Sequence, residues 1–239
     1  MSGHSKWAQI KRQKGANDAK RGATFTKLSN AIAIAVRQGG GMADPSSNFR
    51  LRLAIDSAKA VNMPKENIER AIQRASGKDA SVMEEAVYEG FGPGGIAIIV
   101  EAATDNKNRT SSDIANVFNK NGGNMGQPGS VSYQFNQLGQ ILVKKGTKSV
   151  DDVFLDAADS GAEDIEDQGE EVGVFTQASD LAKVREGLLS KGYEIVEAGI
   201  IRRANISVEL DDDMMEKALA FVERLEDMDD VQHVYTNIA

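Results

Sequence analysis

The sequence predicts a multidomain α+β protein: an N-terminal three-helix domain followed by two α+β domains, one ferredoxin-like (βαββαβ) and inserted into the other. Three observations predict this fold. Apolar residues recur at helical spacing in the first third of the chain, strand-like and helical segments alternate from Ser81 onward, and six consecutive segments follow the order βαββαβ. With 239 residues, 41% of them apolar, the chain is long enough to bury more than one hydrophobic core.

The first 78 residues are predicted to form three helices, each with one apolar stripe. The first runs from Asp18 to Gln38 and ends at a run of three glycines. The second runs from about Asn48 to Val61, with Ser46 or Ser47 as its N-cap. The third begins at Pro64, a favoured first helical position, and ends at Gly77. Three short amphipathic helices predict a small bundle.

The rest of the chain is predicted to form strands with helices between them, because the hydrophobic period changes from helical to alternating. In chain order these are strands 86–91 and 96–103, helix 111–121, strands 131–135 and 140–144, helix 150–160, strands 162–166 and 173–176, helix 179–191, strands 193–201 and 206–210, helix 212–225 and strand 231–237. The segments from 140 to 201 follow the ferredoxin-like order.

The segments on either side of the ferredoxin-like unit complement each other, since β-β-α-β precedes it and β-α-β follows it. We therefore expect a basic helical domain at 1–78, a discontinuous middle domain at 79–137 plus 203–239, and an inserted ferredoxin-like domain at 138–202. A row of contiguous domains is the competing interpretation.

Charge is distributed unevenly along the chain. The net charge is −8, yet residues 1–78 carry +10 and residues 79–239 carry −18. A basic end joined to an acidic remainder is typical of a protein that binds a polyanion through one end, although a solvated basic helix face gives the same count. Without an apolar run of membrane-spanning length or the apolar core of a secretory signal, we expect a cytoplasmic protein without a membrane partner. Because no strong dimerisation seam is evident, we also expect a monomer.

The basic arm, residues 1–28, combines seven cations and one acid with the only tryptophan of the chain, Trp7. Cations neutralise phosphates, and a flat aromatic ring can stack on a base, although Trp7 could equally pack against the helical bundle. A later loop, TDNKNRT at 104–110, could cap a helix or grip a sugar–phosphate backbone. The candidate nucleic-acid-binding residues are Lys6, Trp7, Lys11, Arg12, Lys14, Lys20, Arg21, Lys27, Lys107 and Arg109.

Two glycine-rich segments resemble nucleotide-binding loops but are better explained otherwise. GFGPGG at 90–95 has dinucleotide-site spacing, but a strand rather than a helix follows it, which favours a hairpin turn. KNGGNMGQPGS at 120–130 could cradle a phosphate with its amides, but it lacks the ending of a P-loop. We therefore expect a helix C-cap followed by a mobile loop.

No catalytic or metal-binding arrangement is evident in the sequence. Cysteine is absent, which excludes disulfides, thiolate zinc sites and a cysteine nucleophile, and only His4 and His233 supply imidazoles. The acids at 211–213 are expected to cap a helix, and LEDMDD at 225–230 is expected to form a solvated connection. We therefore expect no enzymatic activity, no cofactor, no metal and no small-molecule substrate. An enzyme with an acidic cleft between the α+β domains is the remaining alternative.

The motifs GHSKWAQIK, DAKRGATFTKL, NMPKENIERAI, YEGFGPGG, TDNKNRT, GGNMGQPGSVSYQF and LEDMDDVQHVYTN occur in this order across almost the whole chain. With them the sequence resembles the YebC/PmpR family, which includes the mitochondrial translational activator of cytochrome c oxidase. The resemblance implies a three-domain cytosolic protein without enzymatic activity or cofactor. Family members are described as DNA-binding transcriptional regulators, and others act in translation at the ribosome.

Two functions follow from the arm and the resemblance. The first is a non-enzymatic DNA-binding regulator of gene expression that binds through the basic N-terminal domain. The alternative is a ribosome-associated translation factor that binds ribosomal RNA and relieves stalling, for example at proline runs. No recognition helix of the helix-turn-helix type and no dimerisation seam is evident in the sequence.

Overall fold

The computed structural model describes residues 18–77 and 83–239, apart from the side chains of residues 18–20. The described chain forms two compact units. One contains the described residues up to Phe135 together with Ala204–Ala239, and the other is the internal segment Asn136–Arg203. The second unit nearly coincides with the segment predicted to be inserted, whereas the helical part and the first sheet belong to one unit. The division into three domains stays a prediction.

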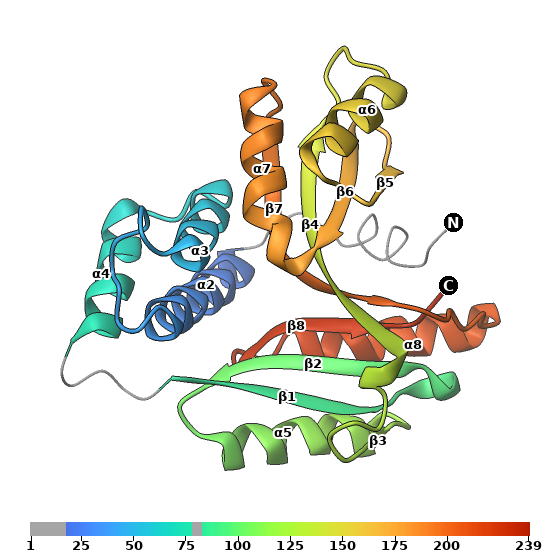
Figure 1. The fold of residues 1–239 in the computed structure, drawn as a ribbon. Helices are drawn as coiled ribbons and strands as arrows, with labels where there is room; N and C mark the ends of the chain where they lie inside the picture. Colours follow the sequence, from blue (N-terminus) through green and yellow to red (C-terminus); the bar gives the residue numbers. More distant parts are fainter. Residues whose placement is uncertain (1–17, 78–82) are drawn as a thin grey trace. The chain divides into compact units, whose positions relative to one another are not determined.

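The three predicted helices are present as α2 (Asp18–Gln38), α3 (Phe49–Ala60) and α4 (Lys65–Ser76), as Figure 1 shows. Their apolar stripes meet in one core, whose most buried side chains are Ile32, Val36, Leu51 and Ala58.

Two details at the helix starts differ from the prediction. The N-cap of α3 is Asn48 rather than Ser46 or Ser47, because its side-chain oxygen accepts from the backbone N–H of Leu51 at 3.1 Å. Its amide also donates to the carbonyl of Ala35 in α2 at 2.8 Å, a bond that ties the two helices together. Pro64 is the N-cap of α4, one residue before the helix, rather than its first residue.

The first sheet has the strand order β3-β1-β2-β8, formed by β1 (Glu84–Phe91), β2 (Ala97–Thr104), β3 (Asn124–Met125) and β8 (Val231–Thr236). Helices α5 (Lys107–Lys120) and α8 (Asp212–Glu226) pack against it, and in Figure 1 both run alongside the strands. Phe118 of α5 meets Phe221 of α8 edge to face, with ring centroids 5.0 Å apart. This aromatic pair and the alternate residues of β2 form the core of the first sheet.

The hairpin between β1 and β2 confirms the turn predicted from GFGPGG. Pro93–Gly95 form a short 3-10 turn, and Gly94 and Gly95 have φ angles of +74° and +77°, which glycine adopts without strain. A strand follows these glycines, so no helix N-terminus is present there to receive a pyrophosphate.

Two predicted strands are wrong. In the segment 131–135, Ser132–Gln134 form a 3-10 turn and Phe135 is already the first residue of β4. The reason lies on β1: the carboxylate of Glu89 takes the backbone N–H groups of Val131 and Ser132, which are therefore unavailable to a strand partner. In the segment 206–210, only Val208 pairs, in an isolated bridge to Ile238.

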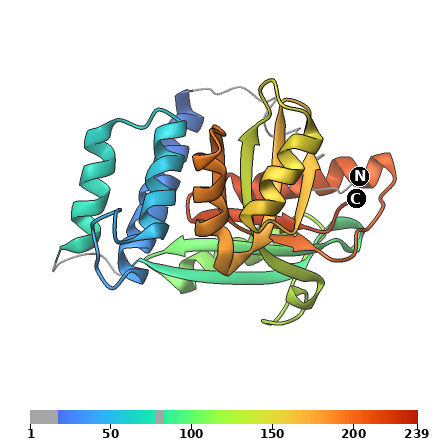
Figure 2. The same ribbon diagram turned by 45° about the horizontal axis from the view of Figure 1, so that its top comes forward.

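The second unit has the predicted βαββαβ order. Its elements are β4 (Phe135–Lys144), α6 (Val150–Ser160), β5 (Asp164–Asp167), β6 (Glu171–Gln177), α7 (Leu181–Ser190) and β7 (Ile195–Ala204), and its strand order is β5-β6-β4-β7. Because β6 lies between β4 and β5, the first βαβ connection is split by a strand, as in ferredoxin-like folds. Figure 2 shows α6 and α7 over one face of this sheet.

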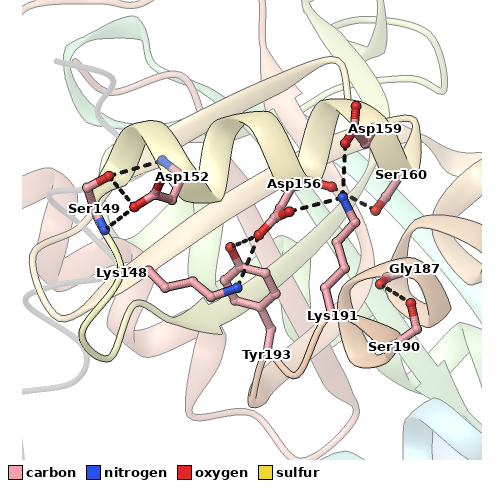
Figure 3. A network of polar contacts seen from close by, with 10 residues as sticks. All are labelled: Lys148, Ser149, Asp152, Asp156, Asp159, Ser160, Gly187, Ser190, Lys191 and Tyr193. Atoms are coloured by element: carbon pink, nitrogen blue, oxygen red, sulfur yellow. Dashed lines mark hydrogen bonds and ion pairs between the residues drawn. The ribbon is translucent and has the colours of Figure 1, made fainter.

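A polar network on this unit, drawn in Figure 3, ties α6 to the turn between α7 and β7. The carboxylate of Asp156 accepts from the hydroxyl of Tyr193 at 2.7 Å and from the ammonium groups of Lys191 at 3.0 Å and Lys148 at 3.1 Å. These donors, led by Tyr193, hold the pKa of Asp156 far below its ordinary value. Lys148 also lies 3.8 Å from the centre of the Tyr193 ring. The cluster therefore holds α6 against the turn between α7 and β7. Both lysines are already bonded to Asp156, so we assign the cluster a structural role.

Candidate nucleic-acid interface

Six of the ten candidate residues fall wholly or partly outside the described part of the chain. Lys6, Trp7, Lys11, Arg12 and Lys14 precede the first described residue, and the side chain of Lys20 is not among the described ones. On α2, Arg21 is exposed. Lys27 donates a hydrogen bond to the carbonyl of Glu226, at the end of α8. Lys27 is therefore engaged within the protein.

The two remaining candidates, Lys107 and Arg109, lie in the first turn of α5 and are paired with carboxylates. Lys107 is 2.5 Å from Glu84, and Arg109 is 3.0 Å from Asp105 and 2.9 Å from Asp230. The hydrogen bond and charge of Asp230 raise the pKa of Arg109 above its ordinary value.

Of the two roles considered for the loop at 104–110, the structure shows the helix cap. Asn106 is the N-cap of α5, and its side-chain oxygen accepts from the backbone N–H of Arg109 at 3.1 Å. The hydroxyl oxygen of Thr104 accepts from the backbone N–H of Asn106 at 2.9 Å and lies 2.8 Å from the hydroxyl oxygen of Thr110. The polar groups of this loop are thus organised around the start of the helix.

Asp230 corrects part of the prediction for LEDMDD, since it is half-buried rather than solvated. Its carboxylate accepts from the hydroxyl of Thr110 at 2.6 Å and from the guanidinium of Arg109 at 2.9 Å. Burial acts to raise the pKa of Asp230, but the bonds from Thr110 and Arg109 outweigh it and lower the pKa below the ordinary value.

The glycine-rich loop before β4 is anchored by a buried carboxylate. Glu89 is 7% exposed, and it accepts the backbone N–H groups of Gly129, Val131 and Ser132, each at 2.9 Å. Burial acts to raise the pKa of Glu89, but these donors outweigh it and lower the pKa. The backbone N–H groups that a phosphate would need already donate to the Glu89 carboxylate. The same bonds hold in place a loop that the sequence predicts to be mobile.

A groove of about 390 Å³ lies in the helical part, with walls from α2 and α4. Its polar side chains are Thr26, Ser29 and Asn30 on α2 and Asn67, Arg70 and Arg74 on α4. Its apolar lining consists of Phe25, Ala33, Met63, Ala71, Ala75 and Met83. The spacing of residues 67, 70 and 74 is that of one helix face, so the amide and both guanidinium groups lie along one wall.

Arg70 and Arg74 differ from Arg37, Arg50 and Arg52 of the helical part because neither has an ion pair or hydrogen bond within 18–77 and 83–239, a state they share with the exposed Arg21 of α2. Arg37 donates to the carbonyl of Met83 at 2.8 Å, Arg50 donates to a side-chain amide oxygen, and Arg52 donates to two backbone carbonyls at 3.1 Å. Two exposed guanidinium groups without a protein acceptor can each bind a phosphate oxygen.

Sequence reasoning missed Arg70 and Arg74 because it looked for aromatic residues within a basic run. The signal that could have found them is their i, i+4 spacing on a short helix, opposite the apolar stripe of Ile68 and Ile72. The sequence does not show, however, that a groove lies beside them.

Neither a metal centre nor a membrane span is found in the part of the chain that the structure describes. No three His, Cys, Asp or Glu side chains are grouped so that they could hold a metal ion, and no described helix is both long and apolar enough to cross a bilayer. Asp211 is the N-cap of α8, as predicted, and accepts from the backbone N–H of Met214 at 2.8 Å.

Comparison with known proteins matches two family descriptions in succession. Residues 5–78 match the TACO1/YebC protein N-terminal domain, and residues 83–238 match the TACO1/YebC second and third domain. A probable transcriptional regulatory protein from Chloroflexus aggregans is 51% identical over 100% of this chain and 95% of its own length. Another, from Treponema denticola, is 49% identical over 100% of this chain and 96% of its own.

A solved structure is similar over nearly the whole chain. The crystal structure of a conserved hypothetical protein from Aquifex aeolicus superposes with a TM-score of 0.86 at 42% identity, covering 95% of this chain and 93% of that one. The arrangement of a three-helix part followed by two α+β sheets therefore occurs in an experimental structure of a relative.

Proposed function

The chain belongs to the TACO1/YebC family, and from this premise we propose that it is a nucleic-acid-binding regulator of gene expression that binds through its basic N-terminal helical part. The relatives described above are named probable transcriptional regulatory proteins, and neither name is that of an enzyme. Our proposal extends that role to this chain and assigns it a surface.

The observation that carries the proposal is that Arg70 and Arg74, on the wall of the groove, have no partner among the residues that the structure describes. A guanidinium group binds phosphate in a bidentate manner and is more weakly hydrated than an ammonium group, so it gives up its water readily. Asn67 and Asn30 add amide donors and acceptors at the same groove. The groove therefore offers the charge and the hydrogen bonds that a sugar–phosphate backbone requires.

The remaining candidate residues keep a place in the proposal according to their surroundings. The cations of the basic arm that precede α2 would add phosphate contacts. Lys27, Lys107 and Arg109 would first have to give up partners within the protein. The acidic charge of residues 79–239 would repel a polyanion and so favour the basic end as the main binding surface.

The test measures fluorescence anisotropy of a labelled duplex DNA and a labelled RNA hairpin at several salt concentrations. The variant Arg70→Gln/Arg74→Gln should lose about tenfold or more in affinity, and the slope of log affinity against log salt should fall by about 2. The control Lys59→Gln/Lys217→Gln removes the same charge from exposed positions outside the groove. It should change affinity by less than about threefold and leave the slope unaltered.

Equal losses in the two variants would contradict the role of the groove, since they would reflect net charge alone. An absence of binding to both nucleic acids would overturn the proposal. Preference for the hairpin over the duplex, together with sedimentation with ribosomal particles at moderate salt, would make the protein a translation factor. Preference for the duplex would make it a DNA-binding regulator.

A further inference from the structure

Tyr133 is an aromatic side chain held out into solvent at the end of the loop that precedes β4. It is 73% exposed, and Ile206, 67% exposed, is the next most exposed of the large apolar residues described. We propose that Tyr133 is a stacking platform for an unpaired base of a single-stranded nucleic acid. This second contact lies outside the three-helix part, and it rests on the proposed function.

The loop that carries Tyr133 is fixed before any ligand arrives. The Glu89 carboxylate binds the backbone N–H groups of Gly129, Val131 and Ser132, the last of which is the residue before Tyr133. The backbone N–H of Gly126 also donates to the carbonyl of Glu89 at 2.8 Å. A loop held by four hydrogen bonds to one residue of β1 loses little conformational entropy on binding, and a ligand on Tyr133 benefits from this rigidity.

The tyrosine ring is positioned by Gln134. The side-chain amide of Gln134 donates to the Tyr133 hydroxyl at 3.2 Å, and its oxygen accepts from Asn237 at 3.2 Å. The backbone carbonyl of Gln134 accepts from the N–H of Asn205 at 2.8 Å. The ring thus has a defined support on one edge, while most of its surface remains open to solvent.

The loop that carries Tyr133 contains no acid, which favours a nucleic acid over a basic partner. The chain has no acid from residue 114 to residue 135, although residues 79–239 as a whole carry a net charge of −18. The loop from Lys120 to Gln134 supplies one cation and several amides and hydroxyls instead. Glu89 is buried beneath it and fully engaged with backbone donors. A phosphate chain could therefore approach Tyr133 without meeting an exposed carboxylate of its own loop.

Phe154 shows the opposite arrangement and provides a matched control. It is 49% exposed on α6, and Asp151 and Asp152 precede it while Asp156 follows it on the same helix. Carboxylates repel phosphates, so an exposed ring in this setting is a poor platform for a nucleic acid. The comparison separates the effect of an aromatic ring from the effect of its electrostatic surroundings.

The experiment measures anisotropy of a labelled 12-nucleotide single-stranded RNA, its DNA counterpart and a blunt duplex. Tyr133→Ala should weaken single-strand binding by about 5- to 100-fold, the range that corresponds to one lost base stack, and should leave duplex binding unchanged. Tyr133→Phe and Tyr133→Trp should retain affinity within about threefold, and Phe154→Ala should match the wild type. Because Tyr133 is exposed, the melting temperature of each variant should stay near that of the wild type.

Unchanged single-strand binding by Tyr133→Ala, while Arg70→Gln/Arg74→Gln still loses affinity, would overturn this inference and leave the proposed function intact. An equal loss with the duplex would also overturn it, since stacking requires an unpaired base. If the wild-type protein binds none of the three probes, both proposals fail.

Discussion

Two regions of the molecule each present a pair of cations in a short helical segment, and the structure treats them differently. At the start of α5, Lys107 and Arg109 lie within 3.0 Å of carboxylates from Glu84, Asp105 and Asp230. On α4, no described carboxylate approaches Arg70 or Arg74 that closely. The comparison shows that nearby carboxylates decide whether a cation is available to a ligand. A count of basic residues in the sequence does not reveal which cations are available.

The first and largest effect is expected from Asp230→Ala, which removes the carboxylate shared by Arg109 and Thr110. Thr110 is fully buried, so its hydroxyl loses a strong acceptor in a site that water does not reach easily. We expect the free energy of unfolding to fall by about 2–3 kcal/mol, measured by urea denaturation. The exposed neighbour Asp229 provides the control, since Asp229→Ala should stay within about 0.5 kcal/mol of the wild type. A small effect of Asp230→Ala would mean that the α5 cations are not tied to the fold.

The contact between Thr110 and Asp230 also shows which features the sequence could predict and which it could not. The bounds of α2 are those predicted, because an acidic start and three glycines mark its ends locally. The βαββαβ order was equally readable from hydrophobic period. The bond between Thr110 and Asp230, by contrast, joins residues 120 positions apart. Because only the folded chain brings these two residues together, the sequence alone predicts a solvated connection at LEDMDD.

The strand wrongly predicted at 131–135 has the same kind of cause. Its alternating pattern is real, but Glu89, 42 residues before Val131, captures the amides that would form a ladder. The cap of α3 failed differently, since three adjacent polar residues could each cap the helix. Asn48 has a side chain that can cap the helix and also bond the carbonyl of Ala35. Sequence reasoning therefore succeeds where the determinants are local and fails where a distant partner decides.

The second prediction concerns the pH dependence of stability and tests the ion pair between Asp230 and Arg109 at the start of α5. The pKa of Asp230 is lowered in the folded protein, so its contribution to stability is fully present above the pKa it has when unfolded, about 3.9. That contribution is lost as the pH falls through the folded value. Urea midpoints of the wild type and Asp230→Ala should therefore differ by a constant amount from pH 7 to about pH 5 and converge below about pH 4. Divergence toward low pH would contradict the lowered pKa.

The third prediction supplies α4 with the carboxylate it lacks. Asn67→Glu places an acid one helical turn before Arg70 on the wall of the groove. We expect affinity for nucleic acid to fall by about tenfold, since the new carboxylate competes with phosphate, while stability changes by less than about 0.5 kcal/mol. The control Ala60→Glu adds the same charge at an exposed position of α3 outside the groove lining. Equal losses in both variants would show that net charge alone controls binding.

The smallest effect on binding is expected from Arg109→Gln. This variant neutralises a paired arginine, whereas the groove variant neutralises two that have no partner among the described residues. Arg109 already donates to Asp230 and Asp105. A phosphate can therefore bind the guanidinium group of Arg109 only by displacing these two carboxylates. Affinity for nucleic acid should therefore change by less than about twofold in anisotropy measurements at moderate salt. Stability should fall, because Asp230 keeps the hydroxyl of Thr110 but loses its cation. A loss of affinity as large as that of Arg70→Gln/Arg74→Gln would mean that the α5 ion pairs open on binding, and the loop at 104–110 would then join the interface.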